Sequence, residues 1–132
     1  MERFVVGQSA QLERTLAEAD VVAFAAVTGD HNPVHLDEAA AASSPFGGRI
    51  VHGMLTASLF STLLATELPG PGVIYLSQTL NFLRPVRLGD TVVARVEITA
   101  IDAARRRITL STTVLNARGK PVVSGEAVVQ RP

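Results

Sequence analysis

The sequence predicts an α+β domain in which a strongly bent antiparallel sheet wraps one long buried helix. Hydrophobic residues recur mainly at helical spacing up to the Pro-Gly-Pro-Gly segment at residues 69–72, and they alternate at strand spacing after it. The last helical segment is apolar on nearly every side, so another part of the protein has to cover it. The strands that follow it can form that cover.

The composition fits one domain and excludes several functions. The chain has 132 residues, of which 47% are hydrophobic, and its 12 Lys and Arg balance its 12 Asp and Glu. It lacks the basic character of a nucleic-acid binder. The absence of cysteine excludes disulfides, thiolate nucleophiles and cysteine-bound metals. Residues 1–7 do not resemble a signal peptide, and residues 50–66 are too polar for a membrane span. We therefore expect a cytoplasmic protein without a membrane partner.

Helical patterns fill the first half of the chain, after a weaker opening strand at residues 4–12. Residues 15–18 match a capping box, hydrophobic residues then recur at helical spacing to Thr28, and Gly29 ends this helix. Residues 37–42 predict a second, short helix. Residues 53–68 predict the third, which is the long buried helix.

Four segments after residue 72 alternate hydrophobic and polar side chains, which indicates strands with one buried face. The predicted buried residues are Ile74, Leu76, Leu80 and Phe82, then Val92, Ala94, Val96 and Ile98, then Ile108, Leu110, Thr112 and Val114, and finally Val123, Gly125, Ala127 and Val129. Turns are expected at residues 88–90, 102–106 and 118–120. Such a sheet cannot easily cover both the helix and its own edges, so we expect dimerisation by edge pairing.

The loop at residues 30–35 carries the first candidate catalytic residues, Asp30 and His35. Near pH 7 an aspartate can accept a proton, and a histidine can donate or accept one. Pro33 restricts itself and Asn32, and the resulting turn can bring both groups toward one water molecule. An ordinary turn with local hydrogen bonds explains the same residues about equally well. On residue type alone, His31 is an exposed loop residue and Asn32 shapes the turn.

Two further candidates belong to the long helix. Gly53 stands at its start, where the amides have no internal partner and could stabilise a developing enolate oxygen. Alternatively, Gly53 only permits close packing. Ser61 lies in the middle of the helix, where a serine hydroxyl often bonds to a carbonyl one turn earlier. Its functional alternative is a pocket hydroxyl near the reacting group. His52 is interpreted simply as a helix-start residue.

Other reactive schemes fit less well. His31 and His35 are four residues apart, but Pro33 between them argues against the helix that a zinc motif would use. The Gly-x-Ser-x-Gly elbow of many serine hydrolases is absent, as is a phosphate-binding glycine loop of the usual kinds. We therefore expect no metal site.

The run DHNPVH at residues 30–35, followed by RIVHGM at residues 49–54, closely resembles the MaoC-like (R)-specific enoyl-CoA hydratases. Residues 58–61, 82–86, 89–90 and 125–127 extend the likeness over almost the whole chain. The length is similar to that of the short bacterial members that supply (R)-3-hydroxyacyl-CoA for polyhydroxyalkanoate synthesis. The resemblance implies one hot-dog domain over residues 1–132, a homodimer, and no metal or redox cofactor.

The resemblance also implies roles for individual residues. Asp30 and His35 would be the catalytic pair, Gly53 would supply an amide to the thioester carbonyl, and Ser61 and Asn32 would complete the substrate site. The reaction would be reversible hydration of trans-2-enoyl-CoA to (R)-3-hydroxyacyl-CoA, with the coenzyme A thioester as substrate. An acyl-CoA thioesterase of the same fold and a non-catalytic acyl-CoA binding module are the alternatives, because fold does not fix function.

Overall fold

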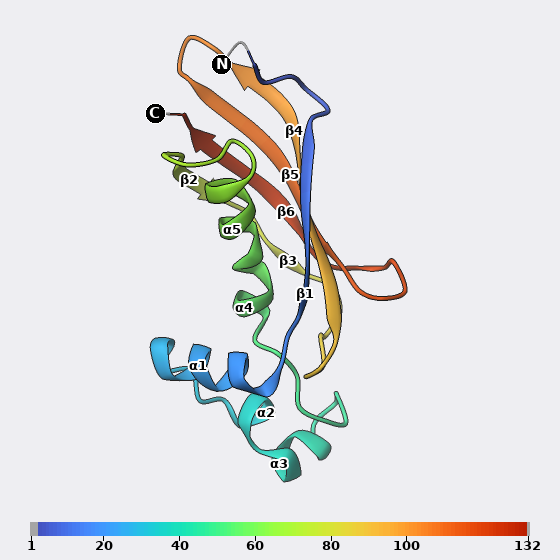
Figure 1. Ribbon diagram of the computed structural model, residues 1–132. Helices are drawn as coiled ribbons and strands as arrows, with labels where there is room; N and C mark the ends of the chain where they lie inside the picture. The colour runs from blue at the N-terminus through green and yellow to red at the C-terminus, as the bar shows by residue number, and fades with distance from the viewer. Residues whose placement is uncertain (1–2, 132) are drawn as a thin grey trace.

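The computed structural model describes residues 3–131 and shows a six-stranded sheet curved around a helical rod (Figure 1). This is the predicted α+β arrangement. Its strands are β1 (Ser9–Thr15), β2 (Ile74–Gln78), β3 (Asn81–Phe82), β4 (Thr91–Asp102), β5 (Arg107–Leu115) and β6 (Pro121–Gln130). The sheet order is β1-β4-β5-β6-β2, with β3 also paired to β6, and the pairings are antiparallel.

The helices are α1 (Glu18–Thr28), α2 (Pro33–Leu36), α3 (Glu38–Ala42), α4 (Gly53–Ala57) and α5 (Leu59–Thr66). In Figure 1, α4 and α5 form the rod along the sheet, whereas α1, α2 and α3 gather at one end of it. The predicted short helix at residues 37–42 is confirmed, since the Asp37 carboxylate accepts hydrogen bonds from the Ala39 and Ala40 amides and caps α3.

The start of α1 differs from the predicted capping box at residues 15–18. Thr15 still belongs to β1, where it pairs with Thr91, and Ala17 is the N-cap residue. The Asp20 carboxylate accepts a hydrogen bond from the Ala17 amide at 2.9 Å and replaces the predicted Glu18 contact. The predicted end is confirmed, because Gly29 takes a left-handed conformation with φ of 79°. The opening strand likewise lies later than predicted, at β1.

The predicted burial of the three long strands is confirmed. The inward residues of β4 and β5 are almost completely buried, and so are those of β6 apart from Gly125, which is half-buried. These strands form the central part of the sheet and pack on the rod. Phe60, Leu63 and Leu64 of α5 lie in the same hydrophobic core.

The predicted buried face of the segment at residues 74–82 is wrong for the single chain. Ile74, Leu76 and Phe82 are 50%, 43% and 54% exposed. The segment divides into β2 and β3, and β2 is an end strand of the sheet with a register shift between Tyr75 and Ser77. This shift interrupts the alternation of β2, and of the four predicted residues only Leu80 is partly buried and packs against the core.

The long helix at residues 53–68 is also corrected. It consists of α4 and α5, interrupted at Ser58, whose hydroxyl donates a hydrogen bond to the Leu55 carbonyl at 2.5 Å. One side is buried, but Met54 is 56% exposed, and Ser58 and Ser61 are also exposed. The sheet therefore covers the rod on one side and leaves the other side open.

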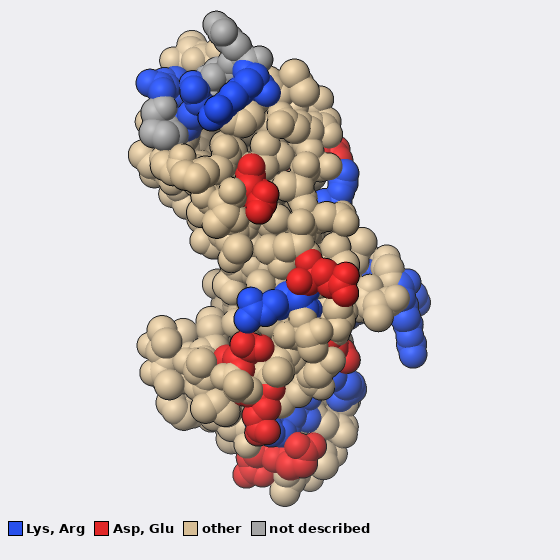
Figure 2. Space-filling view, viewed as in Figure 1, with Lys and Arg blue, Asp and Glu red and all other residues tan. Residues whose placement is uncertain are grey.

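The surface carries both signs of charge. On the face drawn in Figure 2, basic side chains gather at the end near the chain termini, and acidic and basic side chains are intermixed over the rest. The ion pairs include Arg14 with Asp20 and Arg95 with Glu97. Among residues 3–131, no helix combines the length and the apolar character that crossing a membrane requires.

Gly125 is the position where we expect the fold to tolerate a side chain least. A Cβ atom there would lie 1.8 Å from the Thr79 carbonyl oxygen, which belongs to the backbone and cannot rotate away. We expect Gly125→Ala to lower the free energy of unfolding by about 2–3 kcal/mol in urea denaturation. The neighbouring Ser124→Ala should change it by less than about 0.5 kcal/mol. Equal stability of Gly125→Ala and Ser124→Ala would contradict this close approach.

Candidate active site

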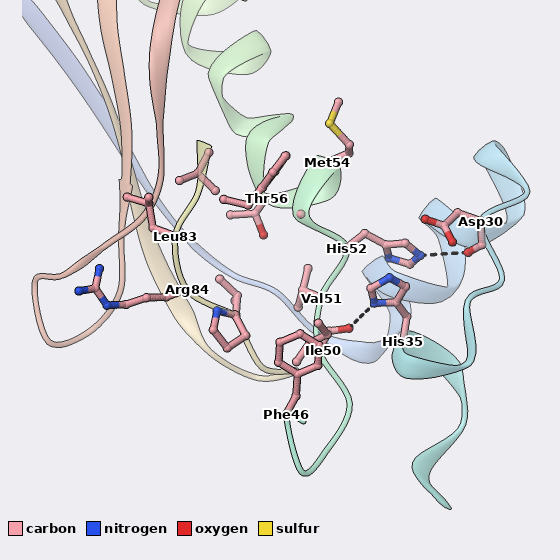
Figure 3. Close-up of a pocket in the computed structure, with 15 residues that line it drawn as sticks. Asp30, His35, Phe46, Ile50, Val51, His52, Met54, Thr56, Leu83 and Arg84 are labelled. Carbon is pink, nitrogen blue, oxygen red and sulfur yellow. Dashed lines mark hydrogen bonds between the residues drawn. The ribbon is translucent and has the colours of Figure 1, made fainter. Parts of the chain in front are cut away.

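A pocket of about 410 Å³ lies where the helical end of the molecule meets the sheet (Figure 3). Asp30, His35 and His52 form its polar end, and Gly53 lies beside them. The rest of the wall is mostly apolar and comes from Phe46, Ile50, Val51, Met54, Thr56, Phe82, Leu83, Arg84, Pro85, Val86 and Val123. The structure therefore brings three of the sequence-predicted site residues, Asp30, His35 and Gly53, into one cavity.

Local hydrogen bonds shape the loop that carries Asp30. The Asp30 carboxylate accepts a hydrogen bond from the Asn32 amide at 3.2 Å, and the Asn32 side chain accepts one from the Val34 amide at 3.2 Å. Asn32 thereby caps α2, with Pro33 in the first helical position. Asn32 does not line the pocket of Asp30 and His35, and its side chain acts at the turn. His31 is exposed, as predicted.

His35 is anchored at both its ring and its backbone. Its Nδ1 lies 2.8 Å from the Ile50 carbonyl oxygen, which can only accept, so Nδ1 carries the proton. In the neutral ring, Nε2 then has a free lone pair. The Arg49 guanidinium donates to the His35 carbonyl at 2.8 Å and pairs with Glu18 of α1. The sequence therefore holds a nearly buried imidazole in one orientation, with its basic nitrogen available.

Asp30, His35 and His52 form a compact cluster. Each offers an oxygen or nitrogen atom, and these atoms lie within 4.8 Å of one another. The rings of His35 and His52 stack with centroids 3.9 Å apart and an interplanar angle of 28°. The lone pairs of stacked rings lie in two offset planes that are nearly parallel, so they do not converge on one point at metal-ligand distance, which suits a shared tetrahedral metal ion poorly. A carboxylate and a nearby imidazole nitrogen are better suited to hold and deprotonate water.

Gly53 begins α4, and its environment supports both interpretations made from the sequence. A Cβ atom at this position would lie 2.7 Å from the Phe82 ring, so the glycine is needed for this close contact. Gly53 also lies in the first turn of the helix, where amides have no acceptor within the helix. The residue can therefore both admit Phe82 and present its N–H at the edge of the pocket.

Ser61 lies in a different place from the Asp30–His35 pair. It lines a second pocket of about 500 Å³, together with Phe24, Met54, Ala57, Ser58, Tyr75, Leu76, Ser77, Gln78 and Leu80. Met54 lines both pockets, so the two adjoin there. In Figure 2 the surface is hollowed between the lobe that carries α1 and the part that carries α5, and uncharged residues surround most of this hollow.

Tyr75 supplies a polar group to the second pocket. Its hydroxyl donates a hydrogen bond to the Gln78 side chain, which in turn donates to Thr112 at 2.8 Å. Burial raises the pKa of the Tyr75 phenol above its usual value of 10.0. The hydroxyl therefore remains a protonated donor throughout the neutral pH range.

His52 and Arg49 are the residues of this site whose contacts the sequence did not predict. His52 was assigned only to the helix start, although it is 2% exposed and contacts both predicted catalytic segments. The one available signal was a histidine within an apolar run that leads into a buried helix. Arg49 lies inside a recognisable motif, but its contact with the His35 carbonyl depends on the folded loop.

Comparisons with known proteins identify the family and agree with this fold. Residues 5–119 match the MaoC like domain family, and the chain belongs to this family. It is 51% identical to the (R)-specific enoyl-CoA hydratase of Aeromonas caviae over 127 residues, which cover 96% of this chain and 95% of that one. It is 48% identical to the 3-hydroxybutyryl-CoA dehydratase of Methylorubrum extorquens over 131 residues, with coverages of 99% and 83%.

Comparison with a solved structure also finds a similar (R)-hydratase. The (R)-hydratase from A. caviae involved in PHA biosynthesis superposes with a TM-score of 0.97 at 49% sequence identity, and the match covers 100% of both chains. The curved sheet around a central helix is thus the hot-dog fold of MaoC-like hydratase structures, as the sequence resemblance implied.

Gly53→Ala tests the close contact with Phe82. The added methyl group would meet the Phe82 ring, so we expect the free energy of unfolding to fall by about 1–2 kcal/mol in urea denaturation. Phe82→Leu in the same chain should recover most of this loss. Gly48→Ala is the control, because a Cβ atom there meets only the end of the Arg87 side chain, at 3.3 Å. A Gly53→Ala protein as stable as Gly48→Ala would contradict the contact.

Proposed function

We propose that this chain catalyses the reversible (R)-specific hydration of trans-2-enoyl-CoA to (R)-3-hydroxyacyl-CoA. The observation that carries this proposal is the placement of Asp30 and His35 together at the polar end of an otherwise largely apolar pocket. The similarity to proteins named (R)-specific enoyl-CoA hydratase, at 51% and 47% identity over nearly the whole chain, supports it. An enoyl thioester needs an apolar wall for its acyl chain and polar groups at its double bond.

In the proposed mechanism, one water molecule lies between the Asp30 carboxylate and His35 Nε2. Asp30 takes a proton as the water oxygen forms a bond to C3, and the electron pair of the double bond moves toward the thioester oxygen. His35 holds the water and assists as the proton taken by Asp30 is delivered to C2, which restores the carbonyl and returns Asp30 to its carboxylate form. Because Asp30 and His35 lie at the same end of the pocket, the hydroxyl and the proton add to the same face.

The substrate-binding roles belong to the same proposal. The Gly53 amide stabilises enolate character on the thioester oxygen at the start of α4. Ser61, in the adjoining pocket, contacts the substrate away from the Asp30–His35 end, and Asn32 acts by shaping the turn. Asp30 and His35 carry out the proton transfers, and the Gly53 amide stabilises the developing charge. We therefore propose that the reaction requires no metal or redox cofactor.

We further propose a homodimer. Exposed hydrophobic side chains cluster on β2, on β3 and on the open side of the rod. They include Ile74, Tyr75, Leu76, Phe82 and Met54, each at least 40% exposed. Neighbouring exposed hydrophobic residues usually mark an interface, and an end strand can pair with another chain. A second copy of the chain would cover these hydrophobic residues and pair with the end strand.

We also propose that the enzyme is cytoplasmic and supplies (R)-3-hydroxyacyl-CoA for polyhydroxyalkanoate synthesis.

Asp30→Asn is the direct test of the proposed activity. The amide cannot accept the proton from water, so we expect turnover to fall by at least about 10²-fold. Loss of the enoyl-thioester absorbance of crotonyl-CoA measures this activity. Asp37→Asn is the matched control, because asparagine caps a helix as well as aspartate does, and it should retain activity within about twofold. Full activity of Asp30→Asn would contradict the mechanism, and free thiol release from butyryl-CoA would favour a thioesterase.

Light scattering after size-exclusion chromatography tests the homodimer. At micromolar concentration we expect twice the 13.9 kDa of one chain. Leu76→Arg should shift the protein toward the monomer, since the charge would be buried in the pairing surface. Val27→Arg replaces an exposed valine on α1 and should leave the mass unchanged. A monomer for the unmodified chain, or equal masses for Leu76→Arg and Val27→Arg, would contradict the proposed surface.

A further inference from the structure

His52 is a buried polar residue that the proposed mechanism does not use. It immediately precedes α4 and is 2% exposed. Its Nε2 lies 3.1 Å from the Asp30 carbonyl oxygen, and its ring stacks on His35. On another side, the Phe24 ring of α1 lies 4.8 Å from it, centroid to centroid. Figure 3 shows the two imidazoles side by side, with His52 directed at the Asp30 backbone. The residue thus joins both proposed catalytic groups.

The hydrogen bond defines which nitrogen of His52 carries the proton. The Asp30 carbonyl oxygen can only accept, so Nε2 is the N–H donor. The other nitrogen, Nδ1, is buried and has no hydrogen-bond partner among the described residues. Burying an unpaired polar atom is unfavourable, and an apolar side chain would avoid that cost. Packing alone therefore does not explain a histidine here, whereas donation to Asp30 does.

Asp30 lies in an exposed loop, so a hydrogen bond from another segment of the chain helps to fix its position. Its other hydrogen bonds among the described residues join it to Thr28 and Asn32, which are only two positions away. His52 is 22 positions away and belongs to the segment that enters α4. The same segment holds His35 through the Ile50 carbonyl, and it ends at Gly53. Residues 50–53 therefore contact or contain all three groups of the proposed mechanism.

We propose that His52 is a positioning residue, which sets the Asp30 carboxylate relative to His35 through its Nε2–H donor and its stacked ring. This inference rests on the proposed hydratase function. His52 supports the polar end of the pocket, whereas the apolar wall holds most of the acyl group. Loss of the donor should therefore lower kcat and change KM little. A misplacement of about 1 Å at a reacting group can cost about 10²-fold in rate.

Two substitutions separate the donor from the bulk of the ring. His52→Gln keeps an N–H donor that can reach the Asp30 carbonyl, and His52→Phe keeps a ring that can stack on His35 but has no donor. With crotonyl-CoA, we expect kcat to fall about 10- to 100-fold in His52→Phe, with KM within about threefold, and to stay within about fivefold of the unmodified enzyme in His52→Gln. His31→Gln changes an exposed histidine in the Asp30 loop; it is the control, and its kcat should stay within about twofold.

The unmodified enzyme gives a second readout that does not depend on how the variants fold. In ¹⁵N-histidine-labelled protein at pH 8, long-range ¹H–¹⁵N correlations should show His52 protonated at Nε2, with the signal assigned by its loss in His52→Gln. An Nδ1–H form of His52, or equal losses of kcat in His52→Gln and His52→Phe, would overturn the positioning role. An unmodified enzyme that does not hydrate crotonyl-CoA would instead overturn the proposed function itself.

Discussion

The packing of α5 into the concave face of the sheet is the constraint on which the rest of the structure depends. Phe60 and Leu63 are completely buried in the hydrophobic core, together with the inward residues of β4, β5 and β6. Each such side chain contributes roughly 1.5–3 kcal/mol when it leaves water. Because α4 is joined to α5 through Ser58, this packing also fixes the segment at residues 50–53. The loop that carries Asp30 and the short helix that carries His35 are then attached to that segment by hydrogen bonds.

The same packing explains why the site lies where it does. A sheet that covers only one side of the rod leaves the start of α4 accessible, and the 410 Å³ pocket opens there. Met54 separates this pocket from the second one, which lies along the open side of the rod toward β2. Polar groups thus gather at the helical end, and apolar surface continues along the rod. A thioester with a reactive double bond and an apolar tail is likewise polar at one end and apolar at the other.

Much of the fold could be predicted from the sequence, because the patterns of β4, β5 and β6 reflect burial within one chain. The sequence pattern of β2 was equally regular, but alternation alone does not establish that the chain covers a strand, so Ile74 and Leu76 were wrongly placed in the core. The capping box failed because Thr15 pairs with Thr91, a distant residue that no local pattern includes. In the site, the motif indicated Asp30 and His35. The proposed role of His52 depends on its contacts with Asp30 and His35. These residues belong to other segments and come close to His52 only in the folded chain.

The central claim is that Asp30 and His35 act on one water molecule from the same side of the substrate. The stereochemistry of hydration tests it most directly. Crotonyl-CoA is hydrated in D₂O, and the product is analysed for its configuration at C3 and for the position of deuterium at C2. We expect only (R)-3-hydroxybutyryl-CoA, with deuterium and hydroxyl added to the same face. An (S) product, a mixture of configurations, or addition to opposite faces would contradict this arrangement.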